Sequence, residues 1–571
     1  MLLTKLRNIS LWSELMLEIN NIDFKKQVSN ANAFYLDLIG HYKSSITESE
    51  HKINYLRHLA NYCWNWHTGR FTSAFIENEL KDISKFFPDS FGENIESDRM
   101  VLLSTELYET GGHTRLLENY ADYLKKRGYK ITLIITRQNV KESPLRIVSE
   151  NKKLFDRIEY LGGTQIADAI KIIRQNVNTA FRVFNFQHPD DTLLVAALNS
   201  NTRPYTYYIN HADHIFWLGI SSSDALINLR PYSNLVTSER RSVNLNTFIL
   251  PVRLNTQQKY LSKSSSRKIL SISDDDIVIT LVSAIWKIFP DRNYNLFEII
   301  EKVLAFNAKV RFILVGVTGA DYERFSGGKV PARVECVGVQ PDTSVYLSVA
   351  DYYMEGMPSN SLTALMDAIY AGCYPFLIWG PYHPNMQMDS ELYVNNEVKH
   401  PADKRIYLDK IQVSLENLEN PEYKLAVGHM QENIKYYCSD AYWDSLMHFN
   451  ESNWTRTDSL APIEFENTLY DQRLAEQAGL LWKMNHRNPY FNTLENLYNN
   501  GLISRKNYLK LWFKSGIKGT HSVVEKINFS WKSILRILPH PIDVVKTYYA
   551  SVNDNNVIKK YYKTVKIAIK K

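Results

Sequence analysis

Two basic residues follow a buried strand in the second half of the chain. The strand-like run that starts at residue 276 ends at Lys287, and Arg292 lies five positions further on. A second strand-to-helix turn follows later, and the helix it opens would begin with Asn360, Ser361, Leu362 and Thr363. Helix N-termini attract anions through free N–H groups and the helix dipole, and Lys and Arg add positive charge. Together these residues favour a nucleotide diphosphate site.

Two carboxylates flank this second turn. Glu355 precedes the turn, and Asp367 lies one turn into the expected helix, which runs from Leu362 to Ala371 and ends at Gly372. Asp367 could accept hydrogen bonds from ribose hydroxyls, or it could only compensate the dipole near the helix N-terminus. An ordinary strand-to-helix connection that binds nothing is the alternative for the turn as a whole.

A cluster of polar residues follows a strand in the first half. The segment 206–219 reads as a strand that runs into His211, Asp213 and His214. A histidine titrates near neutral pH, so it can take a proton from a hydroxyl group. We expect His211 to be the first catalytic candidate, with Asp213 and His214 behind it, against a structural role for all three.

A glycine turn opens this half. The run 100–107 reads as a buried strand, Gly111 and Gly112 form a tight turn, and a helix follows with Leu116, Leu117, Tyr120 and Leu124 on its apolar face. Residues 131–136 form the next strand. Ligands bind at the carboxyl ends of strands in such sheets, but the turn lacks the full dinucleotide-binding glycine pattern.

The elements around these residues alternate between strands and helices. In the first half, strands are expected at 155–162, 181–187 and the first part of 206–219, and segments 226–230 and 234–239 finish it. Residues 262–268 look like a linker, and the second half has strands at 310–317, 332–341 and 374–380. Residues 1–95 and the chain after about 402 read as helical. The aromatic run 62–67 suits core packing better than sugar stacking.

Three segments resemble the GT-B nucleotide-sugar glycosyltransferases over roughly residues 98–440. The stretch TGGHTRLLENYADYLKKRGYKITLI resembles the first glycine turn and helix of the group 1 enzymes. SAIWKIFPDRN resembles their diphosphate-binding segment, and also the phosphate-binding lysine segment of O-GlcNAc transferase relatives. NSLTALMDAIYAG resembles the family's donor-binding loop and helix. The resemblance implies donor contacts for Lys287 and Arg292 and a ribose contact for Asp367.

The sequence departs from the retaining group 1 pattern at one position. Ser359 stands eight residues before Asp367, where those enzymes carry a glutamate, and Glu355 is twelve before it. The small, polar NSLT turn is more similar to the inverting O-GlcNAc transferase type. The stereochemical course therefore stays open. His211 lies where GT-B enzymes often place a histidine that faces the donor sugar.

Composition limits the class of protein. The chain has 571 residues, four widely spaced cysteines and a net charge of +6, of which the last 50 residues alone contribute +7. The body is therefore about neutral, and nucleic-acid binding is not indicated. No signal peptide and no apolar run of about 18 residues is evident, so we expect a cytoplasmic protein. The basic segment 557–571 suits an amphipathic helix on an anionic membrane surface, or a solvated end.

The sequence thus predicts an α/β protein with two Rossmann-like domains (GT-B) and helical extensions at both ends. The expected domains are a helical 1–97, an acceptor domain 98–262, a donor-binding domain 263–455 and a helical extension 456–571. We expect transfer of a sugar from a nucleotide diphosphate donor to a hydroxyl of a growing cell-surface glycan, without a cofactor or metal, on the inner membrane face. A protein glycosyltransferase with 1–95 as polypeptide-binding domain, a nucleotide-sugar epimerase and a non-catalytic subunit of a glycan-assembly complex are the alternatives.

Overall fold

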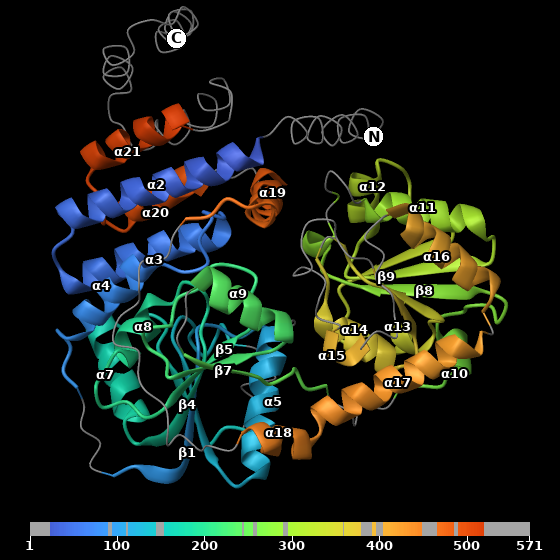
Figure 1. The fold of residues 1–571 in the computed structure, drawn as a ribbon, viewed down its shortest axis with the longest axis horizontal. Coiled ribbons are helices and arrows are strands. Elements are labelled where there is room, and N and C mark those ends of the chain that lie inside the picture. Colours follow the sequence, from blue (N-terminus) through green and yellow to red (C-terminus); the bar gives the residue numbers. More distant parts are fainter. Residues whose placement is uncertain are drawn as a thin grey trace, which may run out of the picture. The chain divides into compact units, whose positions relative to one another are not determined.

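The computed structural model contains two parallel β-sheets and a set of helices that pack together from both ends of the chain (Figure 1). It describes residues 23–89, 94–109, 112–143, 153–241, 245–254, 260–288, 290, 295–357, 359–377, 391–394, 404–418, 420–447, 465–484 and 489–518. Gly111, Arg292 and the basic segment 557–571 lie outside these residues. The chain divides into one unit over 1–512 and a second over 513–571.

The first sheet has seven strands in the order β3-β2-β1-β4-β5-β6-β7. All neighbouring strands run parallel. The strands are β1 (Glu96–Ser104), β2 (Lys130–Ile135), β3 (Arg157–Tyr160), β4 (Ala180–Phe186), β5 (Thr206–Asn210), β6 (Ala225–Asn228) and β7 (Asn246–Ile249). The connecting helices are α5 (Gly112–Lys126), α7 (Ile166–Val177), α8 (Thr192–Leu198) and α9 (Pro231–Arg241). The predicted α/β alternation of this half is confirmed.

The centre of this sheet shows why continuous apolar runs form such strands. Residues 100–103 of β1 are 0% exposed, because helices cover both faces of a parallel sheet. Helix α5 buries the apolar positions expected from its helical spacing, Leu116, Leu117, Tyr120 and Leu124. This burial sets α5 against the sheet with its N-terminus at the carboxyl end of β1.

Two local expectations for this region need correction. The first half does not finish at residue 239, because 234–239 lies inside α9 and the last strand is β7. Pro231 opens α9, and proline is preorganised for the first turn of a helix. Segment 262–268, expected as a linker, forms most of α10 (Lys263–Ile269), whose N-cap Ser262 accepts from the Ser265 N–H.

The second sheet has five parallel strands in the order β10-β9-β8-β11-β12. They are β8 (Ile277–Val282), β9 (Val310–Val315), β10 (Val334–Gly338), β11 (Tyr352–Met354) and β12 (Tyr374–Phe376). Its helical elements are the single 3-10 turn η2 (Ile285–Lys287), α11 (Leu296–Phe306), α12 (Gly319–Ser326), α13 (Ser344–Ser348) and α14 (Leu362–Tyr370). The two Rossmann-like sheets implied by the resemblance are therefore present.

The chain then returns from the second sheet to the first. Helices α15 (Glu391–Val394), α16 (Lys404–Glu416) and α17 (Pro421–Cys438) pack on the second half, and α18 (Asp440–Leu446) reaches α5. Trp443 of α18 is fully buried, with its ring 4.9 Å from that of Tyr120 and 5.0 Å from that of Tyr123. The first sheet thus has part of its helical cover supplied by residues more than 300 positions later.

Helices from the two ends of the chain form a common module. The N-terminal helices are α2 (Phe24–Ser45), α3 (Ser49–Asn65) and α4 (Ala74–Ser84), and the C-terminal ones are α19 (Leu469–Met484), α20 (Pro489–Asn499) and α21 (Arg505–Lys518). Helix α19 packs on α2 and α20 packs on α3 (Figure 1). The predicted helical character of both extensions is confirmed where the structure describes them.

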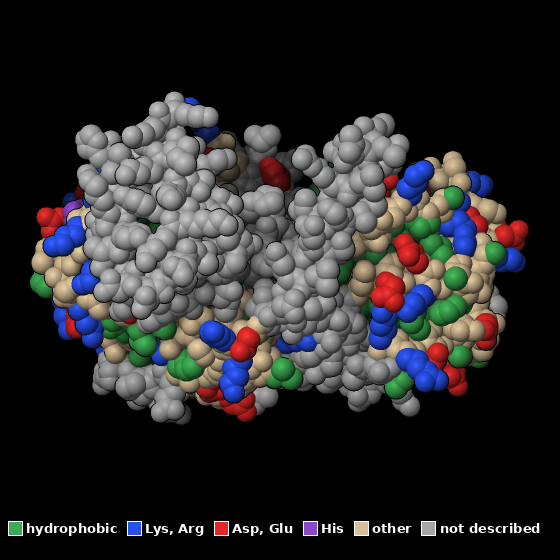
Figure 2. All heavy atoms as spheres, turned by 90° about the horizontal axis from the view of Figure 1, so that it is seen from above, with side chains coloured by type: hydrophobic (Ala, Val, Ile, Leu, Met, Phe, Trp, Pro, Cys, Tyr) green, Lys and Arg blue, Asp and Glu red, His purple; other side chains and the backbone are tan. Residues whose placement is uncertain are grey.

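The described surface carries charges of both signs. In the face shown by Figure 2, Lys and Arg side chains alternate with Asp and Glu. No helix among the described residues is long and apolar enough to cross a membrane.

Candidate functional site

Lys287 is held directly over the start of α14. Its Nζ donates to the backbone oxygen of Asn360 at 3.0 Å and lies 3.1 Å from Oγ of Ser361. The backbone is also tied here, because the N–H of Ser359 donates to the oxygen of Lys287 at 3.1 Å. The structure therefore brings together the lysine and the helix start that the sequence predicted as one anion site.

The loop before α14 is braced by Glu355. This carboxylate is 5% exposed, and its Oε1 accepts from the N–H groups of Gly356 at 2.8 Å and Ser361 at 3.0 Å. A Cβ atom added at Gly356 would lie 3.0 Å from Ile288 Cγ2 and from the Ser359 oxygen, so a larger residue there would require its neighbours to shift by a few tenths of an ångström. Glu355 thus fixes the shape of the loop before α14 from within.

The N–H groups of Leu362, Thr363 and Ala364 are those that a ligand could use. The first bond along α14 runs from the Leu365 N–H to the Ser361 oxygen, so these three N–H groups precede it. The N-cap Ser361 makes no side-chain capping bond. With the Lys287 ammonium alongside, the helix start presents donors and positive charge.

The N-terminus of α5 faces the same place. A Cβ atom added at Gly112 would lie 3.9 Å from Cγ2 of Thr363, so the first turns of α5 and α14 almost touch. These helices follow β1 and β11, one strand from each sheet. Two helix N-termini from the two Rossmann-like halves therefore converge, which fits one anionic group between them.

Asp367 lies on α14 one turn further in. It is 9% exposed, and its Oδ1 accepts from the Tyr260 hydroxyl at 3.4 Å. Burial raises the pKa of Asp367 to about 6, although the positive charge of Arg115 on α5 opposes the shift. A desolvated carboxylate at this position is ready to accept hydrogen bonds from ligand hydroxyl groups.

Three histidines meet at the carboxyl edge of the first sheet. The ring of His113 on α5 lies 4.5 Å from that of His211 and 5.4 Å from that of His188. His211 was expected in the site, whereas His113 and His188 were not. A usable signal existed, because these residues follow β1, β4 and β5, and a sheet with those strands adjacent places their ends together.

The hydrogen bonds of these rings fix the tautomers. Nε2 of His113 donates to the Phe186 oxygen at 2.8 Å, which leaves Nδ1 as the acceptor. Nδ1 of His211 donates to the Ile209 oxygen at 3.2 Å, which leaves its Nε2 as the acceptor. His211 therefore offers a lone pair to a hydroxyl group.

All three rings are neutral at pH 7. Burial, with the neighbouring rings of His113 and His188, lowers the pKa of His211 well below its usual value. Burial likewise lowers the pKa of His113, and it lowers that of His188 to about 3. A proton on one ring would be repelled by charge on the next, so we expect the cluster to hold no more than one proton at a time.

Asp213 and His214 have other surroundings. Asp213 is buried in an ion pair with Arg230, with contacts of 2.6 and 2.8 Å, and it also accepts from the Ser233 hydroxyl. Burial would raise the pKa of Asp213, but the Arg230 guanidinium holds it well below its usual value. His214 is 42% exposed and lies 3.2 Å from Asp213. Asp213 thus reads as a structural anchor beneath the loop.

The N-terminal helices reach this edge as well. The Trp64 ring of α3 lies 6.0 Å from that of His188, and the Tyr108 ring stacks on the same His188 ring at 5.8 Å. Asn61 of α3 donates to Asp190 at 2.9 Å. Tyr62, Cys63, Trp66 and His67 are buried, which confirms core packing for most of that aromatic run.

No group of three or more His, Cys, Asp or Glu side chains within the described part of the chain is arranged to hold a metal ion. Backbone oxygens set the orientation of two of the three histidine rings, those of His113 and His211. They act as hydrogen-bonding groups in this arrangement.

The known proteins that resemble this chain were found by comparing structures. No protein-family model matches the chain. No curated protein matches it. Among solved structures, the Anabaena protein HepE in complex with UDP and glucose is 13% identical with a TM-score of 0.48, over 61% of this chain and 98% of HepE.

Two further solved structures cover comparable lengths. A mutant of the Thermobaculum terrenum O-GlcNAc transferase is 12% identical with a TM-score of 0.46, over 80% of this chain and 83% of that one. A mutant of S. aureus TarM in a complex that includes UDP is 10% identical with a TM-score of 0.46, over 62% of this chain and 100% of that one. Because one fold can host many functions, these similarities assign no activity to the chain.

Proposed function

We propose that the chain is a GT-B glycosyltransferase that moves a sugar from a nucleotide diphosphate donor to an acceptor hydroxyl. The main support for this proposal is the position of Lys287, whose side chain contacts the start of α14 opposite the first turn of α5. Lys287 and the free N–H groups would stabilise the diphosphate as negative charge develops on it. Arg292, which lies outside the described residues, is proposed as a second cation, and Gly111 as part of the facing turn.

The transfer exchanges one bond for another. The bond from the sugar C1 to the diphosphate oxygen breaks and the oxygen keeps the electron pair, while C1 bonds to the acceptor oxygen. The hydroxyl proton passes to Nε2 of His211, the acceptor nitrogen of that ring. Asp367 would accept from the ribose hydroxyls, and Glu355 would keep the loop in shape. The anomeric configuration of the product, compared with that of the donor sugar, shows whether the transfer is retaining or inverting.

The acceptor is proposed to be a hydroxyl of a growing cell-surface glycan. Trp64, Tyr108 and the histidines offer ring faces and hydrogen-bonding edges together, which suits the mixed apolar and polar faces of a sugar. If labelled sugar were transferred to polypeptides and not to glycans, the chain would be a protein glycosyltransferase. If it were transferred to nothing, the chain would be a binding subunit.

The test is a screen of nucleotide sugars by thermal shift, hydrolysis and product mass spectrometry. We expect at least one UDP-, GDP- or dTDP-sugar to raise the melting temperature and to be consumed. In the His211→Gln variant, donor binding should persist while turnover falls by about two orders of magnitude. The absence of stabilisation by every donor would contradict the proposal, and full turnover in the variant would remove His211 from the mechanism.

We also infer that the basic segment 557–571 holds the enzyme on the inner face of a membrane. It carries six lysines and apolar residues at helical spacing, a pattern that binds anionic lipid surfaces. Deletion of 557–571 should weaken sedimentation with vesicles that contain phosphatidylserine, and not with neutral vesicles. Equal sedimentation of the full and shortened chains would reject the membrane role.

A further inference from the structure

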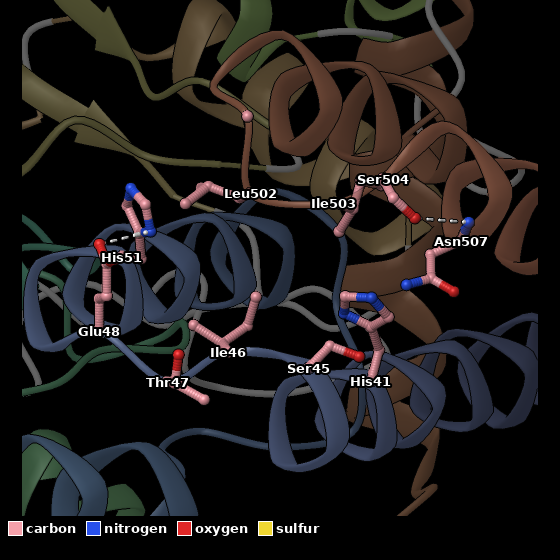
Figure 3. A pocket seen from close by; sticks show the side chains of 11 residues that line it. His41, Ser45, Ile46, Thr47, Glu48, His51, Leu502, Ile503, Ser504 and Asn507 are labelled. Atoms are coloured by element: carbon pink, nitrogen blue, oxygen red, sulfur yellow. Dashed lines mark hydrogen bonds and ion pairs between the residues drawn. The ribbon is translucent and has the colours of Figure 1, made fainter.

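A pocket of about 250 Å³ lies within the helical module, and it shares no residue with the site described above (Figure 3). It is formed by the end of α2, the first turn of α3, and the turn between α20 and α21. Its lining residues are His41, Ser45, Ile46, Thr47, Glu48, His51, Gly501, Leu502, Ile503, Ser504 and Asn507. At about 30 Å³ per water molecule, this is room for roughly eight waters, or for one sugar ring.

His41 gives the pocket an unfilled hydrogen-bonding capacity. Its side chain rises from α2 towards the first turn of α21 in Figure 3, and the residue is 9% exposed. Its ring stacks on Tyr55 at 5.7 Å, and among the described residues neither ring nitrogen has a hydrogen-bond partner. Leaving a buried polar group unsatisfied costs about 1–3 kcal/mol, so a ligand or ordered solvent that bonds to it would be favoured.

The protonation of His41 decides what it can bind. Burial and the nearby charge of Lys510 lower the pKa of His41, so the ring is neutral at pH 7. A neutral imidazole offers one donor and one acceptor. A hydroxyl group, which also donates and accepts, is therefore a better partner for His41 than a bare anion.

The other lining residues also favour a ligand with hydroxyl groups. Ser45, Thr47, Ser504 and Asn507 add groups that can both donate and accept, and Ile46 and Leu502 add apolar surface. The His51 ring and the Glu48 carboxylate already contact each other at 3.2 Å. Among the described lining residues there is no Lys or Arg, and the Glu48 carboxylate would repel an anion.

We propose that this pocket is a second binding site, for one neutral polyhydroxylated unit of the size of a sugar ring. The preference for a ligand with several hydroxyl groups rests on the lining residues of the pocket alone. The assignment of that unit to a carbohydrate acceptor rests on the proposed function, since a glycan held here would stay attached while its end is extended elsewhere. The site adds a binding subsite to the chain and takes no part in the bond exchange.

Histidine-selective NMR of the full chain tests this directly. With ring ¹⁵N-labelled histidine, the His41→Phe variant identifies the His41 signals, since phenylalanine preserves the stack on Tyr55. Glucose, galactose and N-acetylglucosamine are then titrated with the protein saturated with UDP. We expect at least one sugar to shift the His41 signals, and Thr47→Val to weaken that binding by about tenfold, the loss of one hydrogen bond.

The matched control is Ser445→Ala on α18, whose exposed hydroxyl donates to the Tyr442 oxygen at 2.7 Å and lies outside the lining, and it should bind as the unaltered chain does. The proposal is overturned if no sugar moves the His41 signals, if inorganic phosphate moves them instead, or if Thr47→Val and Ser445→Ala behave alike. The melting shift with UDP reports on the Lys287 site separately. Failure of the donor site and failure of this pocket are therefore distinguishable.

Discussion

We expect the ammonium group of Lys287 to determine whether the start of α14 can bind a diphosphate. Lys287→Met keeps most of the side-chain length but removes the ammonium that lies 3.0 Å from the Asn360 oxygen. We expect UDP affinity to fall at least tenfold, because a charge-assisted contact contributes about 1.5–3 kcal/mol. Isothermal titration measures this. Lys302→Met, on the exposed face of α11 beside Glu298, is the matched control and should leave affinity unchanged.

Asp367 links ligand binding to stability. Its pKa of about 6 lies above the value near 3.9 expected in the unfolded chain, so the folded state binds the proton more tightly. Stability should therefore decrease as pH rises from about 4 to 6 and stay lower above that range. Asp367→Asn removes this cost, and at pH 7.5 it should stabilise the free protein by up to about 3 kcal/mol while it weakens UDP binding.

Urea unfolding at pH 4.5 and pH 7.5 measures the effect, which should shrink at the lower pH. Glu323→Gln removes an exposed carboxylate of α12 and should change neither the unfolding free energy nor the affinity for UDP. A variant at 367 that is no more stable at either pH would show that the carboxyl is not held in an unfavourable environment.

Residue types near strand ends were enough to select candidate residues that the fold then brings to the strand ends. Lys287, Asn360–Thr363 and His211 were identified because charged and polar residues after buried strands stand out in the sequence. Asp213 was predicted to stand behind His211, but its partner Arg230 comes 17 residues later, and only the fold shows this ion pair. The roles of Gly111 and Arg292 stay predictions.

Among the elements, close packing between the loop after β9 and the loop after β8 sets the position of Lys287. Gly316, just after β9, has φ of +90°, and a Cβ there would lie 2.2 Å from the Ser283 oxygen at the end of β8. Gly316→Ala must displace the segment that leads to Lys287. We expect a loss of about 2–4 kcal/mol in unfolding free energy and weaker UDP binding, since both backbone strain and a clash are introduced.

The helix α17 supplies the matched substitution. Gly428 has no atom within 4 Å of an added Cβ, so Gly428→Ala should stabilise the protein by about 1 kcal/mol, the usual difference in helix propensity. Both variants are measured by urea unfolding. Equal effects at the two positions would mean that Gly316 is not a point of close approach.

At this scale the sequence predicted most strands and helices but not their neighbours. Apolar runs of parallel strands and the helical spacing of α5 and α14 are local signals. The histidine cluster depends on β1, β4 and β5 being adjacent, and strand order is set by packing of the whole sheet. His113 and His188 were therefore overlooked although each was visible at a strand end.

A buried carboxylate joins three distant parts of the whole molecule. Asp471 of α19 is 0% exposed and lies 2.7 Å from His67 and 2.7 Å from Arg240. Burial would raise the pKa of Asp471, but the hydrogen bonds and charges of His67 and Arg240 hold it below its usual value. Its stabilisation is therefore present above about pH 4 and is lost as pH falls further.

Asp471→Asn should lower the unfolding free energy by roughly 3 kcal/mol at pH 7, since it leaves the Arg240 guanidinium without its buried charge partner. The loss should be smaller at pH 3, where the unaltered chain has also lost stability. Urea unfolding at both values measures this. Glu466→Gln removes a half-exposed partner of the same Arg240 and should cost less than about 1 kcal/mol.

The pairing of the two ends was the largest feature that the sequence did not indicate. Amphipathic spacing in α2, α3 and α20 shows that each helix buries a face, but it does not identify the partner. Contacts between residues more than 400 positions apart settle that, for example from Gln27 to the backbone of Ala475.

This long-range pairing has a consequence for how the protein is made. A ribosome adds about 5–20 residues per second, so α2 and α3 leave the exit tunnel on the order of half a minute before α19 and α20 exist. Over the same interval Tyr120 and Tyr123 wait for Trp443. The nascent chain thus carries uncovered apolar helix faces through most of its synthesis, which makes it a natural client for chaperones that bind emerging polypeptides. A chain cut short before Trp443 would lack the cover of all these faces.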